Sequence, residues 1–213
     1  TCKHVPFTEH GIFTREQSDL IFTAILRLTE IPVGQANSPY TSVDYSSGLG
    51  IFLEKDKKKH PISYTIARWV VSSLSPQCLD AENSILNSLE GLLESIDTFF
   101  HPSNQGAWTS MLAQLTFYLT EMFVSRWNKE TRAEQDTPAE RRLNDAIKHR
   151  FVKSLREVTF MGLFGKSTKV TNMYFGALQN LTYLEPDLML PGALQRFYPS
   201  LQGLVEVHRT TSS

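Results

Sequence analysis

WVVSSLSPQCL, residues 69–79, and ALQNLTYLEPDL, residues 177–188, follow one pattern: an apolar helix end, then Leu-x-Pro, then another helix. Pro76 and Pro186 occupy equivalent places in the two copies. Because proline disfavours helix in the residue before it, each copy predicts a turn between successive helices. The repetition favours a stack of antiparallel helix pairs. A closed helix bundle stays open as the alternative, since the copies are not separated by a clean multiple of one period.

Apolar residues recur at helical spacing along most of the chain and predict an all-α fold. The expected helices cover residues 14–31, 62–75, 80–101, 108–127, 137–155, 167–184 and 191–207. Capping-box patterns, Thr14 with Gln17 and Thr137 with Glu140, predict the starts of two of them. The residues expected to be buried are Trp69, Trp108, Trp127, Leu89, Leu115, Phe151 and Leu181.

The chain divides into three predicted parts. Residues 1–31 form an N-terminal helical segment, residues 32–61 a long polar loop, and residues 62–213 the helical repeats. A connection as long as 32–61 is typical of functional or disordered loops. The chain begins without methionine and ends in a polar string, so we expect a fragment of a much larger protein. A small protein that has lost only its initiator methionine is the alternative.

Composition narrows the class of protein. Hydrophobic residues make up 41% and charged residues 20% of the 213 residues, with a net charge of −1. This balance is typical of a folded soluble protein and does not favour nucleic acid or an anionic membrane as partner. No stretch approaches the roughly 18 consecutive apolar residues of a membrane-spanning helix. The two cysteines, Cys2 and Cys78, argue against a disulfide scaffold.

One string suggests chemistry. Gly165-Lys166-Ser167 matches the end of a phosphate-binding loop, which would make Lys166 and Ser167 part of a phosphate-handling enzyme. The earlier glycine of that motif is replaced by Phe160, and helix-forming residues precede the string instead of a strand. The sequence therefore favours a turn between two helices, with Ser167 as the cap of the second. The histidines and cysteines show no metal-ligand spacing, so neither a metal nor a cofactor is expected.

Two charged regions remain. The lysines of EKDKKKH form a local basic cluster that could contact an anionic partner, while interruption by acidic residues equally suits a solvated loop. The candidate contact residues are Lys55, Lys57, Lys58 and Lys59. The second region, residues 126–142, alternates in sign and predicts an exposed, salt-bridged helix face and connection.

Three blocks carry a family resemblance: FFHPSNQGAW at 99–108, MFVSRW at 122–127, and ALQNLTYLEPDLMLPGALQRFYPSLQGLVEVHRTTSS at 177–213. Together they resemble the central region of the very large single-chain HEAT-repeat proteasome activators, the fungal bleomycin-resistance activator and its animal and plant counterparts. The resemblance implies an α-solenoid fragment. It covers roughly the second half of the chain.

The resemblance further implies a scaffold, not an enzyme. Members of this family cap the proteasome core particle and open its gate without ATP or ubiquitin, admitting peptides and unfolded or acetylated proteins. They act in the nucleus and cytoplasm, with links to DNA repair, and some bind inositol phosphate at residues that we cannot match here. Gate opening uses a C-terminal hydrophobic-Tyr-x tail, whereas this chain ends in Thr-Ser-Ser, so the fragment alone is expected not to activate. A HEAT-repeat adaptor or transport receptor is the alternative function.

Overall fold

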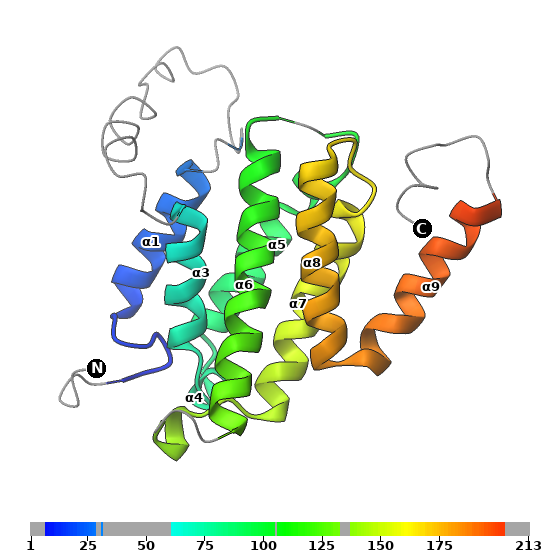
Figure 1. Ribbon diagram of the computed structural model, residues 1–213. Coiled ribbons are helices and arrows are strands. Elements are labelled where there is room, and N and C mark those ends of the chain that lie inside the picture. The colour runs from blue at the N-terminus through cyan, green and yellow to red at the C-terminus, as the bar shows by residue number, and fades with distance from the viewer. Residues whose placement is uncertain (1–6, 29–30, 32–60, 105, 133–136, 203–213) are drawn as a thin grey trace, which may run out of the picture.

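The computed structural model describes residues 7–28, 31, 61–104, 106–132 and 137–202, and most of these residues lie in helices (Figure 1). Their only β feature is an isolated bridge between Thr8 and Gly11. The helices, with the short 3-10 segments η1 and η2, are α1 (Arg15–Leu28), α3 (Ile62–Ser73), α4 (Gln77–Asp80), α5 (Ile85–Ser95), η1 (Asp97–Phe100), α6 (Trp108–Thr131), η2 (Ala139–Arg141), α7 (Asp145–Gly162), α8 (Thr168–Leu184) and α9 (Pro186–Gln202). The predicted all-α fold is confirmed. The predicted loop at 32–61 lies outside the described residues except for Pro61.

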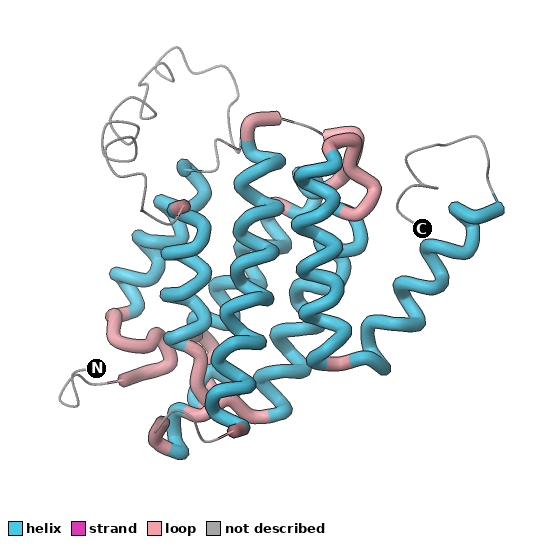
Figure 2. Tube along the Cα trace, in the orientation of Figure 1, coloured by secondary structure: helices cyan, strands magenta, loops and turns pink. Residues whose placement is uncertain are grey.

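The long helices alternate between two rows. In one row α6 contacts α3 on one side and α8 on the other; in the second row α7 contacts α5 and α9. Figure 1 shows that α3, α6 and α8 run in one direction and that α5, α7 and α9 return in the other. The described connections lie above and below the rows, at the ends of the helices that they join (Figure 2). Consecutive helices are therefore antiparallel pairs stacked side by side, which is the HEAT-like arrangement that the sequence predicts.

The helix starts confirm some capping predictions and correct others. At α1 the Thr14 hydroxyl accepts from the Gln17 amide and the Gln17 side chain accepts from the Thr14 amide, as the capping box predicts. The helix expected from Asp80 is wrong in its start: Asp80 ends the short α4, and Ser84 caps α5 instead.

The predicted second capping box is also wrong. Thr137 and Glu140 do not begin α7; Asn144 does, by accepting from the Ile147 amide at 2.9 Å. Residues 137–142 are held instead by arginine side chains that donate to two of their backbone carbonyls. Arg142 donates to the Thr137 carbonyl, and Arg126 of α6 donates to the Arg141 carbonyl. The segment forms only the short η2.

The two Leu-x-Pro copies occupy equivalent places in the stack. Each follows a helix of the first row, α3 before Pro76 and α8 before Pro186. Pro186 begins α9 directly, at the position where a missing amide costs no hydrogen bond, so the predicted start at Pro191 is five residues late. After Pro76 the short α4 intervenes before α5.

The core lies between the two rows. Four of the residues expected there are fully buried: Leu89, Leu115, Phe151 and Leu181. Phe123 of α6 stacks on Phe151 of α7 with ring centroids 4.2 Å apart, and this contact joins the rows at their centre. The prediction of burial is wrong for Trp69, Trp108 and Trp127, which pack against the core but are only partly buried.

Two glycines allow neighbouring helices to approach closely. A Cβ at Gly162 of α7 would lie 2.4 Å from the Tyr174 ring of α8. A Cβ at Gly176 of α8 would lie 2.7 Å from the Phe117 ring of α6. A side chain at Gly162 would push α7 away from α8, since the buried Tyr174 ring has no room to yield, whereas the Phe117 ring is only partly buried.

Candidate functional site

The predicted anionic-partner residues lie outside the described part of the chain. Nothing is therefore added to the prediction for Lys55, Lys57, Lys58 and Lys59, which stays a prediction.

The Gly165-Lys166-Ser167 string is a turn between α7 and α8, as the sequence favours. Lys166 is exposed, and the Gly165 amide donates to the Gly162 carbonyl while the Gly165 carbonyl accepts from Thr171 Oγ1. The backbone of this turn is thus folded onto itself and follows a helix, whereas a phosphate-binding loop follows a strand and points free amides at its ligand. Ser167 is at the N-cap position of α8, but its side chain makes no capping hydrogen bond.

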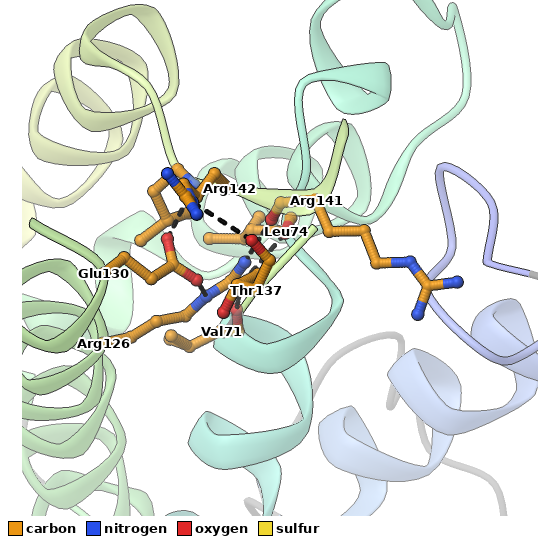
Figure 3. Close-up of polar contacts among 8 residues, drawn as sticks. Val71, Leu74, Arg126, Glu130, Thr137, Arg141 and Arg142 are labelled. Carbon is orange, nitrogen blue, oxygen red and sulfur yellow. Dashed lines mark hydrogen bonds and ion pairs between the residues drawn. The ribbon is translucent and has the colours of Figure 1, made fainter. Parts of the chain in front are cut away.

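A buried polar network of the described structure is centred on α6. Figure 3 shows Arg126 and Glu130 between the C-terminal end of α3 and the connection that leads to α7. Arg126 Nε lies 2.8 Å from Glu130 Oε1, and the two side chains are only 13% and 4% exposed. Arg126 and Glu130 therefore form a buried ion pair between side chains one turn apart on the same helix.

Arg126 bonds to the backbone of two other segments. Its Nη1 donates to the Val71 and Leu74 carbonyls at the end of α3, and its Nη2 donates to the Arg141 carbonyl of η2. The last carbonyls of a helix have no partner within the helix and carry its negative dipole end. A guanidinium therefore both completes their hydrogen bonds and balances their partial charge.

Glu130 completes the same junction from the other side. Its second carboxylate oxygen accepts from the Leu143 amide at 2.8 Å, just before α7 begins. The Arg126–Glu130 pair thus joins α3, α6, η2 and the start of α7, which belong to two successive helix pairs. We call this set of contacts the interior junction.

The interior junction corrects the prediction of an exposed face at Arg126 and Glu130 only: these two side chains form a salt bridge but are buried, whereas most of the other described residues of 126–142 are exposed. A signal for it was present in the sequence. Residues 119, 123, 126 and 130 recur at the spacing of one helix face, and Leu119 and Phe123 are fully buried. The apolar face of α6 therefore continues into Arg126 and Glu130, which the alternating charges obscured.

Ion pairs at the second row are more exposed. Arg150 of α7 makes a two-pronged contact with Glu90 of α5 at 2.8 and 2.6 Å, and this bonding raises the pKa of the guanidinium further. On the other side, Glu157 of α7 accepts from Arg196 of α9 at 2.6 Å. Arg196 also stacks over Phe160 of α7, 4.4 Å from the ring centroid. The second row is thus tied along its length, from α5 through α7 to α9.

Two other buried groups have shifted pKa values. Burial raises the pKa of the Cys78 thiol, which is free and lies beside α5. Burial also raises the pKa of the Tyr174 hydroxyl. Both groups are therefore neutral in the folded protein, which suits packing roles.

The described residues assemble no group of three or more histidine, cysteine or acidic side chains that could hold a metal ion. Within the same residues, none of the helices combines the length and apolar character that crossing a membrane requires.

Alternating rows of antiparallel helix pairs, joined by contacts between successive pairs, define a helical-repeat protein of the HEAT type. Comparison of the sequence with known protein families specifies which helical-repeat proteins the chain is related to. Residues 89–213 match the family model for the mid HEAT repeats region of proteasome activator complex subunit 4, and the chain belongs to this family.

Relatives from animals and a plant agree with this assignment. The chain is 29% identical over 200 residues to proteasome activator complex subunit 4B of Danio rerio, and 27% identical over 200 residues to subunit 4 of Homo sapiens, each alignment covering 91% of the chain. Proteasome activator subunit 4 of Arabidopsis thaliana is 28% identical over 191 residues, 89% of the chain. The similarity thus extends well beyond the second half of the chain, which carries the three resembling blocks. In each case the matched segment is 10% of the relative's length.

Proposed function

We propose that this chain is a structural segment of an activator that caps the proteasome core particle and opens its gate. In the proposal, the full-length parent admits peptides and unfolded or acetylated proteins without ATP or ubiquitin. The observation that carries the proposal is the match of residues 89–213 to a region of proteasome activator complex subunit 4. The role of the segment is structural: its helix pairs form part of the curved wall of the activator.

The interior junction supports a scaffold role. Arg126 and Glu130 fix the end of α3 against η2 and the start of α7 through a buried ion pair and four backbone contacts. Such a network has one arrangement in which all its polar groups are satisfied, so it sets the orientation of one helix pair relative to the next. A wall that must hold its curvature over many pairs requires junctions of this kind.

The test is association of the parent protein with the proteasome core. Full-length parent carrying an affinity tag should co-purify with core-particle subunits, and the 213-residue chain should not, because it supplies only a small part of the contact surface. Co-purification with a transport cargo or a small GTPase, and no core-particle subunits, would overturn the proposal in favour of an adaptor.

The finer parts of the proposal rest on the family resemblance. We expect the parent in the nucleus and the cytoplasm, with a part in DNA repair. Inositol phosphate is a candidate ligand of the parent, at residues that we do not assign. The lysines at 55 and 57–59 are candidate contacts for an anionic partner, with a solvated loop as the alternative. Fractionation of cells and binding of inositol hexakisphosphate to the purified parent test these parts separately.

A further inference from the structure

A cluster of basic side chains lies where α7 meets α9, at the edge of the array (Figure 1). Arg156 of α7 and Arg196 of α9 approach the same aromatic ring, with their guanidinium carbons 5.3 and 4.4 Å from the ring centroid of Phe160. Phe160 is fully buried, whereas the two arginine side chains are 29% and 33% exposed. The buried ring therefore positions two guanidinium groups at the protein surface.

A single carboxylate joins the two guanidinium groups. Glu157 Oε1 accepts from Arg156 Nη1 at 2.8 Å, and Glu157 Oε2 accepts from Arg196 Nη2 at 2.6 Å. Lys153 is exposed one turn before Glu157 on the same face of α7, and none of the ion pairs among the described residues includes it. Three cationic side chains thus share one carboxylate, and the cluster has an excess of positive charge.

The hydrogen-bond donors of the cluster also exceed its acceptors. A guanidinium group carries five N–H donors, and Arg156 Nε has no hydrogen-bond partner among the described residues. The Glu185 carboxylate, just before α9, lies 2.8 Å from His149 Nδ1 and is therefore engaged elsewhere on α7. Gly192 of α9 leaves the space that Arg156 occupies, since a Cβ there would lie 2.5 Å from Arg156 Nη2.

We propose that Lys153, Arg156 and Arg196, which we call the α7–α9 basic site, bind an acidic segment of a partner protein, rich in aspartate and glutamate. Glu157 is the internal carboxylate that occupies the two arginines in the free chain, and a carboxylate of the partner competes with it for the same donors. The inference goes beyond the proposed function, because it concerns a site that this chain contains by itself.

The surroundings of the basic site favour carboxylates over nucleic acid and other phosphate-rich ligands. Its residues lie within α7 and α9, away from the helix N-termini whose free amides bind phosphate. Phe160 is buried beneath the guanidinium groups, so it offers no exposed ring on which a base can stack. The planar arginine forks match the planar carboxylate that already bonds to them.

The experiment measures binding of a short fluorescein-labelled peptide of alternating glutamate and serine to the 213-residue chain, by fluorescence anisotropy. We expect binding that weakens as salt rises. Arg156→Gln and Arg196→Gln should each raise the Kd about fivefold, because each removes one charged donor. Glu157→Gln should lower the Kd about threefold, because it removes the competing internal charge. A gain of binding of this kind does not arise from misfolding.

Two control variants remove positive charge elsewhere. Arg68→Gln removes one exposed arginine from α3, in the other row, and should change the Kd less than twofold. The loop lysines are the other candidate for an anionic partner, so a variant that changes all four of them to glutamine should bind the peptide as the original chain does; its substitutions are Lys55→Gln, Lys57→Gln, Lys58→Gln and Lys59→Gln.

Absence of peptide binding at low salt would overturn the inference, as would weaker binding by Glu157→Gln. Equal weakening by Arg68→Gln and Arg156→Gln would show a general effect of charge, and loss of binding in the lysine variant would assign the peptide to the loop; either result overturns the inference. Inorganic pyrophosphate that binds more tightly than the peptide, and loses affinity in Arg156→Gln, would assign the site to phosphate instead. Co-purification of the parent with the core particle is scored separately, so these outcomes are independent of the proposed function.

Discussion

The contact between α7 and α9, at one edge of the stack, is built differently from the contact between α3 and α6. Between α3 and α6, the interior junction buries an ion pair whose partners are mainly backbone groups. Between α7 and α9, the Glu157–Arg196 pair remains partly exposed and bonds mostly side chain to side chain. Successive helix pairs are thus joined by a buried polar network where α3 meets α6 and by a more exposed ion pair at the α9 edge.

The largest expected effect is at the interior junction. Arg126→Ala should lower the free energy of unfolding by about 3–5 kcal/mol, because it leaves the Glu130 carboxylate buried without its partner charge. Three backbone carbonyls also lose a donor. Equilibrium unfolding in urea measures the loss.

The double variant Arg126→Met with Glu130→Leu sharpens the comparison. This double variant removes both charges, so it should recover part of the unfolding free energy that Arg126→Ala loses. The recovery should be incomplete, since the Leu143 amide and the α3 carbonyls no longer have the Glu130 and Arg126 side chains as partners. A double variant as stable as the original protein would show that the junction does not depend on its backbone contacts.

A smaller effect is expected from helix spacing. Gly162→Ala should destabilise by about 1–3 kcal/mol, because the new methyl group overlaps the Tyr174 ring and α7 must move from α8. Gly91→Ala, on an exposed face of α5 with nothing within 4 Å, should instead stabilise by about 0.5–1 kcal/mol through helix propensity. Thermal unfolding of the two variants checks whether their stabilities change in opposite directions. Destabilisation by both would contradict the packing argument.

Alkaline pH should lower the free energy of unfolding because the Tyr174 hydroxyl is buried. Its pKa is raised in the folded protein, so the unfolded chain ionises first and stability, fully present below about pH 10, falls as pH rises above it. Cys78 contributes in the same direction from about pH 8.5. Tyr174→Phe should make the fall shallower by about 1.4 kcal/mol per pH unit above pH 10, measured by urea unfolding across pH. An unchanged slope would show that Tyr174 ionises alike in both states.

The smallest effect is expected at the edge. Arg196→Ala should cost about 1 kcal/mol or less, and the cost should shrink at 1 M salt because the pair with Glu157 is partly exposed. Urea unfolding at low and high salt measures it. A loss as large as that of Arg126→Ala would remove the distinction between middle and edge.

Much of the fold could be predicted from the sequence, because apolar spacing and Leu-x-Pro turns are local signals. The helix pairs, the Thr14 cap and the turn at Lys166 follow from residues close in the chain. The interior junction could not, since Arg126 contacts carbonyls more than fifty residues away. The false cap at Thr137 has the same cause: its segment is held by arginine side chains, a tertiary contact that outweighs a local pattern.

The scaffold proposal is tested most directly by peptide hydrolysis. Purified core particle would be assayed without ATP in the presence of the full-length parent, or of the 213-residue chain. We expect faster hydrolysis of a fluorogenic peptide with the parent and the basal rate with the chain alone. An unchanged rate with a folded, core-bound parent would contradict it.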